Sequence, residues 1–183
     1  LSMRTHMLND EDLSKLRTYL LSLMPTCEMV DGYVTANAEG ETSSIPELGW
    51  VPKGQRWSSH GVGGTSCHDS YQADRGRTAV NYEGQPSRVH TYGNSFTHCD
   101  QVSNGETWQE YLAAHIQEPV RNFGVGGWSV YQAYRRMLRE EPRVSADYLI
   151  LNIYDDDHYR NLDAWRNIRV HKHPQHIESP LPH

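Results

Sequence analysis

The chain has 183 residues with 23 acidic and 17 basic side chains, which gives a formal net charge of −6 with histidine neutral. This length suits one domain with its own core, and the acidic balance argues against a nucleic-acid partner, which needs a basic surface. No apolar run approaches the roughly 18 residues of a membrane span, so none is expected. Hydrophobic residues make up only 37% and mean hydropathy is −0.76, although five Trp and eleven Tyr argue against disorder.

The sequence pattern of residues 1–25 predicts an N-terminal helix. Asn9 or Asp10 can cap its start, and Pro25 ends it because proline cannot continue a helix. Leucines recur at helical spacing between these points: Leu13, Leu16, Leu20 and Leu23. We expect this helix to dock on the flank of the domain.

Residues 26–87 form a loop-rich lead-in. Gly, Ser, Pro and Thr are frequent there, and only short pieces such as Tyr33–Ala36 are typical of strands. So long a segment is uncommon as a mere connection inside a compact domain. Because it contains Trp50 and Trp57, we expect it to pack on the same domain.

Residues 88–161 carry the regular pattern of an α/β core. Three strands and two helices alternate there: strands at 88–92, 120–123 and 148–154, a helix from a capping box at Ser103–Glu106 to Ile116, and a helix at 130–140. The last strand is a nearly continuous apolar run, which predicts burial on both faces. The β-α-β-α-β order predicts an α/β fold with a right-handed parallel sheet and helices on both sides.

Polar or glycine-rich clusters follow these strands at Gly93–Phe96, Asn122–Gly127 and Asp155–His158. The carboxyl ends of parallel strands meet at one edge of a sheet, where ligands bind. Ser95 lies just past a glycine on the first turn, a placement that suits a nucleophile. The glycine-rich turn after the second strand can offer a backbone N–H to a developing oxyanion.

The three clusters resemble the sequence blocks of the SGNH/GDSL hydrolase superfamily. Tyr92–Thr97 looks like the first block, Asn122–Trp128 like the second and Asp156–Asn161 like the third. Pro46–Trp50 and the later Gly76-Arg77 are similar to the lead-in of bacterial members. The resemblance implies a three-layer α/β/α, flavodoxin-like fold with a parallel sheet. It also implies serine-dependent hydrolysis of an ester.

Roles for single residues come from the same resemblance. Ser95 would be the nucleophile, and the oxyanion would bind the backbone N–H groups of Ser95 and Gly127 together with a side chain at Asn94 or Asp156. The implied substrate is a small-molecule or carbohydrate ester, such as an O-acetyl group on a sugar. No cofactor and no resident metal are expected.

Two residues depart from the family pattern. The family usually has aspartate before the nucleophile, where this chain has Asn94, and asparagine in the third block, where it has Asp156. An ionised carboxylate at Asp156 would repel an oxyanion, whereas a protonated one with a raised pKa could donate to it. An exchange of roles between Asn94 and Asp156 is a further hypothesis.

The general base is the least defined part of the predicted site. The family's Asp-x-x-His block follows a further strand and helix, whereas twenty-two residues follow Asn161 here. The spacing of Asp155 and His158 fits a catalytic pair, although it overlies the third block. Alternative bases lie in the polar, histidine-rich tail at residues 162–183: His171, His173 and His176.

Three other interpretations stay open. The chain could be one piece of a larger enzyme, with a missing segment or a second chain completing the fold. It could be a non-catalytic SGNH-like domain that binds a glycan or a protein. A weaker alternative is metal-dependent hydrolysis through Asp155, Asp157 and the tail histidines, because histidines two and three apart can ligate zinc or copper.

For several other residues a structural role is the favoured hypothesis. His68 and Asp69 are predicted in a surface loop, and His98 is expected to support the nucleophile turn from behind. Core packing is favoured over a sugar-stacking platform for three tryptophans: Trp50, Trp57 and Trp128.

Overall fold

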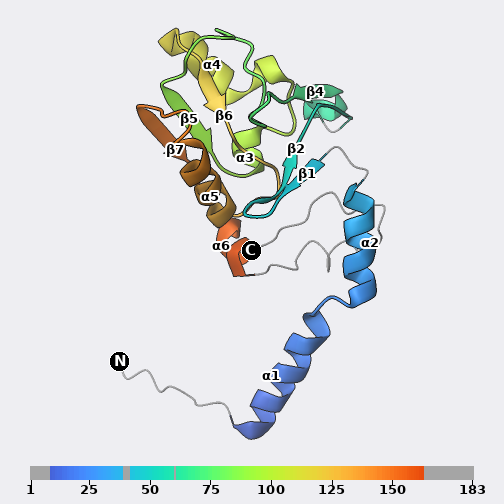
Figure 1. The fold of residues 1–183 in the computed structure, drawn as a ribbon. Helices are drawn as coiled ribbons and strands as arrows, with labels where there is room; N and C mark the ends of the chain where they lie inside the picture. The colour runs from blue at the N-terminus through green and yellow to red at the C-terminus, as the bar shows by residue number, and fades with distance from the viewer. Residues whose placement is uncertain (1–8, 39–41, 60, 163–183) are drawn as a thin grey trace.

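The computed structural model describes residues 9–38, 42–59 and 61–162 (Figure 1). Its centre is a three-stranded parallel sheet in the order β6-β5-β7. The strands of this sheet are β5 (Val89–Tyr92), β6 (Val120–Asn122) and β7 (Tyr148–Leu151). The three predicted strands and their parallel pairing are therefore confirmed, and the fold is of mixed α/β type.

One helix covers each face of this sheet. α4 (Trp108–Ile116) lies on one face and α5 (Val130–Glu140) on the other, because side chains of one strand alternate between the two faces. Each helix closes a small apolar cluster: Val89, Ala113 and Val120 under α4, and Tyr92, Phe123 and Ala133 under α5. The predicted capping box is present in a 3₁₀ turn (Asn104–Glu106) ahead of α4, with Ser103 and Glu106 bonding reciprocally.

The prediction that β7 is buried on both faces is wrong. β7 is an edge strand, and Tyr148, Leu149 and Ile150 are 60%, 46% and 38% exposed. α4 and α5 cover β5 and β6, and the described residues leave most of β7 uncovered. The apolar run therefore predicted the strand correctly, but it did not show which elements would cover the two faces of that strand.

The N-terminal part of the chain is helical. Asn9 caps α1 (Asp10–Leu23) by accepting a hydrogen bond from the Asp12 N–H at 2.8 Å, and α2 (Cys27–Ala38) follows. The predicted strand at Tyr33–Ala36 is wrong, because those residues continue α2. Thr26 Oγ1 accepts a hydrogen bond from the Met29 N–H and so caps the start of this helix. The strand propensity of the four residues at 33–36 does not reveal a helix that begins upstream of them.

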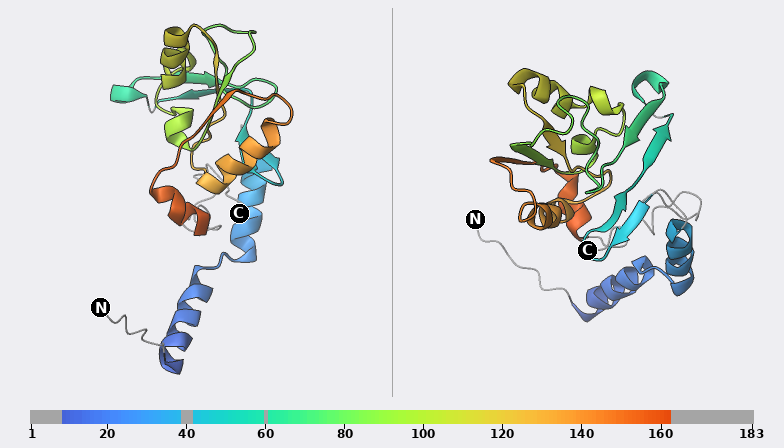
Figure 2. Two further views of the ribbon diagram at one scale, coloured as in Figure 1. Left: turned by 90° about the vertical axis from the view of Figure 1, so that its left-hand side faces the viewer. Right: turned by 45° about the horizontal axis from the view of Figure 1, so that its top comes forward.

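The predicted docking of the N-terminal helix is also wrong. The described apolar side chains of α1 are exposed: Leu13, Leu16, Tyr19, Leu20 and Leu21. In Figures 1 and 2, α1 runs away from the α/β core beyond α2. Leucines at helical spacing define an apolar face, but what that face contacts is set by tertiary structure.

Two short antiparallel hairpins follow α2 in the lead-in. The first joins β1 (Thr42–Ile45) to β2 (Gly49–Pro52), and the second joins β3 (Gln55–Ser58) to β4 (Cys67–Ser70). The first hairpin is sealed to the core by a cluster of buried side chains: Leu48, Trp50, Val51, Val125 and Trp128. The first hairpin thus packs against the loop that follows β6.

The tryptophans divide between core and surface. Trp128 is fully buried, and its indole N–H donates to the Trp50 carbonyl at 3.1 Å, so both rings serve the core as favoured. Trp57 is 73% exposed, which contradicts core packing for that residue, because it sits on the outer side of β3.

Two short helices complete the described fold at the carboxyl end of the sheet. α3 (Ser95–His98) follows β5, and α6 (Asp156–Leu162) follows β7. The tail histidines His171, His173 and His176 lie outside the described residues. In the described part of the chain, no helix is both long and apolar enough to cross a membrane.

Gly124 tests the close packing of the loops at this end. A Cβ there would collide with the backbone nitrogen of His98 and lie 2.7 Å from the Thr97 carbonyl carbon, neither of which can yield. We expect Gly124→Ala to lower the free energy of unfolding by about 1–3 kcal/mol in denaturant titration. The control Gly32→Ala, in α2 with open space around its Cβ, should leave it unchanged or raise it by up to about 1 kcal/mol. Equal losses in both variants would contradict this account.

Candidate active site

Ser95 begins α3 directly after the central strand β5. Asn94 caps this helix, with its Oδ1 accepting from the Phe96 N–H at 2.9 Å. Gly93 is needed before it, because a Cβ at that position would collide with the Thr97 side chain. Ser95 is half-buried, and its hydroxyl forms no hydrogen bond within the described part of the chain. The strand-to-helix turn therefore places Ser95 at the carboxyl edge of the sheet, with a hydroxyl that no described residue engages.

Asn94 also links the ends of β5 and β7. Its amide nitrogen donates to both Asp157 oxygens, at 2.9 and 3.1 Å, and both residues are 1% exposed. The Tyr154 N–H donates to the same carboxylate, and Arg160 Nη1 lies 3.5 Å away. Because both polar ends of the Asn94 side chain are engaged, it positions Ser95 and does not point a free donor at a substrate.

Asp156, the other predicted oxyanion residue, turns away from this link. Its carboxylate accepts from Arg160 Nε at 3.0 Å, one helical turn further along α6. The same arginine donates to the Trp128 carbonyl at 3.1 Å, which ties α6 to the loop after β6. Gly127 lies in that loop with a φ of 79°, a left-handed conformation that favours glycine.

Among the described residues, no basic side chain forms a hydrogen bond with the Ser95 hydroxyl. Asp155 and His158 are both exposed, at the start of α6, and no hydrogen bond or ion pair joins their side chains in the residues described. Their backbones are in contact, with the His158 N–H donating to the Asp155 carbonyl at 3.3 Å. The tail histidines lie outside the described residues, so they are not placed relative to Ser95.

Two aromatic rings pack on each other at the sheet edge where Ser95 lies. Phe96 and Tyr154 follow β5 and β7, and their ring centroids are 4.9 Å apart with a tilt of 55°. Both remain open to solvent, with exposed fractions of 58% and 43%. Exposed apolar groups next to a reactive side chain are typical of a ligand-binding surface.

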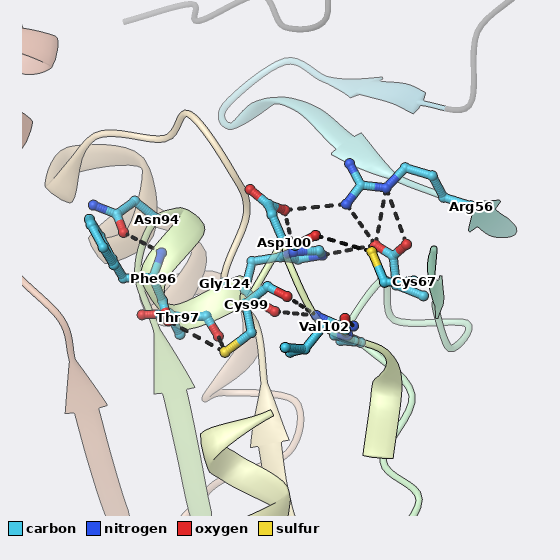
Figure 3. Close-up of polar contacts among 12 residues, drawn as sticks. Arg56, Cys67, Asn94, Phe96, Thr97, Cys99, Asp100, Val102 and Gly124 are labelled. Atoms are coloured by element: carbon cyan, nitrogen blue, oxygen red, sulfur yellow. Dashed lines mark hydrogen bonds and ion pairs between the residues drawn. The ribbon is translucent and has the colours of Figure 1, made fainter. Parts of the chain in front are cut away.

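A partly buried charge cluster supports α3 from the other side (Figure 3). Arg56 from β3 pairs with Asp69 at 2.9 Å and with Asp100 at 3.3 Å. The Tyr71 hydroxyl donates to Asp69 and lies 2.9 Å from His98 Nε2. His98 Nδ1 lies 2.5 Å from Asp100 Oδ1, off the line of a good hydrogen bond. His98 therefore supports the nucleophile turn from behind, as predicted.

The same cluster corrects the interpretation of Asp69. Asp69 is 2% exposed on β4, not in a surface loop, because Arg56 and Tyr71 supply the partners that a buried carboxylate needs. Burial acts to raise the pKa of Asp69, but the hydrogen bonds from Arg56 and Tyr71 and the charge of Arg56 outweigh it, so its pKa lies below the ordinary value. The pKa of Asp100 is lowered in the same way, by His98 and Arg56 against its own burial.

Arg77 closes the turn that follows α3, a role that its resemblance to the family's lead-in does not indicate. It is 2% exposed, and its guanidinium donates to the carbonyls of His98, Cys99 and Val102 and to the Asn104 side chain. Its partners are mostly backbone carbonyls, which carry no residue-type signal. Arg56 and Tyr71 were not predicted as members of the cluster because, apart from the contact between Tyr71 and Asp69, their partners lie 13 to 44 residues away along the chain.

No group of three or more His, Cys, Asp and Glu side chains in the described ranges could hold a metal ion. Among the residues of the weaker metal hypothesis, Asp157 is engaged with Asn94 and Asp155 is exposed before α6. No protein-family model matches the sequence, and no curated protein matches it either. Function is therefore inferred from the geometry of the site.

The Asn94–Asp157 pair allows a test by exchange. Asn94→Asp places a carboxylate against the buried Asp157 carboxylate, and we expect it to lower the free energy of unfolding by about 3 kcal/mol or more. The double variant Asn94→Asp/Asp157→Asn restores one amide and one carboxylate, and should recover at least half of that loss. Denaturant titration of the wild type, both single variants and the double variant gives the coupling energy. Additive losses would show that the two side chains do not depend on each other.

Asp69 makes a pH-dependent contribution to stability. Its pKa is lower in the folded chain than the ordinary 3.8, so the unfolded chain binds more protons as the pH falls through about 4. The stabilisation is present at neutral pH and is lost on acidification. We expect Asp69→Asn to lower the free energy of unfolding by about 2 kcal/mol at pH 7 and to flatten its decline between about pH 5 and 3.

The matched control for Asp69→Asn is Glu83→Gln, which changes an exposed carboxylate far from the cluster. It should shift the stability curve by less than about 0.5 kcal/mol and leave its acid limb unchanged. An Asp69→Asn curve parallel to that of the wild type across this pH range would contradict the assignment of a lowered pKa.

Proposed function

We propose that this chain is a serine-dependent ester hydrolase of SGNH type, with Ser95 as the nucleophile. The observation that carries the proposal is the position of Ser95, which starts a helix at the carboxyl end of the central parallel strand with its hydroxyl unengaged by the described residues. A nucleophile needs a fixed backbone and a free hydroxyl. Asn94 supplies the first by capping α3 and binding Asp157.

The proposed oxyanion site uses backbone donors. Asn94 is fully engaged and Asp156 pairs with Arg160, so neither side chain is assigned to the oxyanion. The N–H groups of Ser95 and Gly127 form no hydrogen bond in the described part of the chain, and both follow strand ends of the same sheet edge. Preorganised backbone donors of this kind stabilise the charge that develops on the attacked carbonyl oxygen.

The surroundings of Ser95 favour a neutral ester. Phe96 and Tyr154 offer an apolar surface at its side, while Asp155 adds an exposed negative charge directly after Tyr154. This charge disfavours an anionic acyl group by repulsion. An acetyl ester, including an O-acetyl group on a carbohydrate, meets both conditions. We further propose that the sheet belongs to the three-layer, flavodoxin-like arrangement of the SGNH family, with no cofactor in the reaction.

Ester turnover before and after Ser95→Ala tests the proposal. With an aryl acetate as substrate, we expect kcat/KM to fall by about 1,000-fold or more, because the acyl group loses its covalent acceptor. A fluorophosphonate probe should label the wild type and not the variant. Ser66→Ala, at an exposed serine outside the site, is the matched control and should retain full turnover.

The same assay assigns the base. If kcat/KM falls as far in His158→Gln as in Ser95→Ala, His158 is the general base that accepts the Ser95 proton. Full activity in His158→Gln would exclude that role. Turnover unchanged by Ser95→Ala would reject Ser95 as the nucleophile.

The second candidate function is a non-catalytic SGNH-like domain that binds a glycan or a protein. It is favoured by the absence of any base against Ser95 Oγ in the residues described. Neither turnover nor fluorophosphonate labelling would be seen in that case. Glycan binding measured by calorimetry, unchanged in Ser95→Ala, would establish it.

A further inference from the structure

β7 has an unprotected outer edge. The strand reads Tyr148-Leu-Ile-Leu151 and contains no charged residue and no proline, the devices by which proteins prevent edge strands from pairing. In Figures 1 and 2 its outer side faces away from the rest of the core. In the described part of the chain, no strand pairs with it there.

The backbone of β7 specifies the kind of partner. The N–H groups of Tyr148 and Asn152 donate to the Arg88 and Tyr92 carbonyls at 2.9 and 2.8 Å. Alternate residues of a strand direct their backbone groups to opposite edges, so Leu149 and Leu151 direct theirs outward. An outward row of N–H and C=O groups is matched by an extended strand, not by a helix.

The side chains of β7 specify its chemistry. Leu149 and Leu151 share the α5 face, where Leu151 packs against the Tyr92 cluster, while Tyr148 and Ile150 share the α4 face. Apolar surface is thus exposed on both faces of the strand. A matching partner strand is apolar on both faces and uncharged.

We propose that β7 pairs with β7 of a second copy of this chain, antiparallel across a two-fold axis. The two three-stranded sheets then form one sheet of six strands. Among the strands described, no other fits the edge. β1 and β2 are already paired as one hairpin and β3 and β4 as another, β5 is interior, and the outer side of β6 is met by Arg77 at Asn122. Identical uncharged edges meet without repulsion, and such a contact closes on itself.

Symmetry also gives a consistent register. Directly opposed residues of an antiparallel pair lie on the same face of the sheet. An axis through Ile150 places that residue against its own mate and Leu149 against the partner's Leu151. The outward backbone groups of Leu149 and Leu151 then bond mutually, and apolar side chains meet on both faces of the sheet.

Sedimentation equilibrium of the full chain tests the pairing. We expect a dimer in the wild type, and at least a tenfold higher dissociation constant in Ile150→Lys, because two ammonium groups would face each other across the axis. Leu16→Lys, which changes an exposed leucine of α1, is the matched control and should dimerise like the wild type. Circular dichroism of each variant shows whether it is folded.

Amide hydrogen exchange on the wild type gives a second measurement that needs no variant. Exchange at Leu149 and Leu151 should slow as the protein concentration rises, whereas exchange at Tyr148 and Asn152, which already bond to the β5 side, should not change. A monomer at about 100 μM would overturn the proposal. So would a dimer that survives Ile150→Lys, or exchange at Leu149 and Leu151 that is independent of concentration, because each places the contact on another surface.

Discussion

The hydrogen bond from the Asn94 amide to the Asp157 carboxylate is the contact on which the candidate site depends. It joins the segments that follow β5 and β7, through two residues that are 63 positions apart in the sequence. Both side chains are buried. A buried carboxylate is tolerated only when donors surround it, and here the Asn94 amide and the Tyr154 N–H supply them, with Arg160 nearby. Ser95 has a defined position because the residue before it is held from both sides.

The C-terminal end of α3 is held by residues of the lead-in at 26–87, the segment in which the sequence predicts the fewest regular elements. Arg77 gathers the carbonyls that follow the helix, and the cluster of Arg56, Asp69 and Tyr71 meets His98 from the second hairpin. A helix of four residues has little stability of its own. The lead-in at residues 26–87 therefore supports α3 on the side opposite Phe96. These polar contacts explain how a polar, glycine-rich segment can be tightly packed.

The sequence predicted what local pattern determines and failed where tertiary partners decide. β5, β6, α4 and α5 follow from periodicity and capping, and the place of Ser95 follows from parallel topology. The role of Asp157 could not be found, because neighbouring residues of a helix point about 100° apart, and only the orientation of α6 selects it over Asp156. The predictions that β7 is buried and that α1 docks on the domain were wrong for the same reason, because an apolar face in the sequence does not show which element packs against it.

The low apolar content has a structural counterpart in the interior. Among the described residues, buried polar and charged side chains outnumber buried hydrophobic ones, sixteen to thirteen, so directional hydrogen bonds hold much of the core. The apolar side chains of β7 contribute little to it, although β7 leads directly into Tyr154 and Asp157. A strand paired along β7 would bury that surface and restrict the loop that carries Asp157. The proposed association at the sheet edge would therefore be coupled to order at Ser95 through one strand.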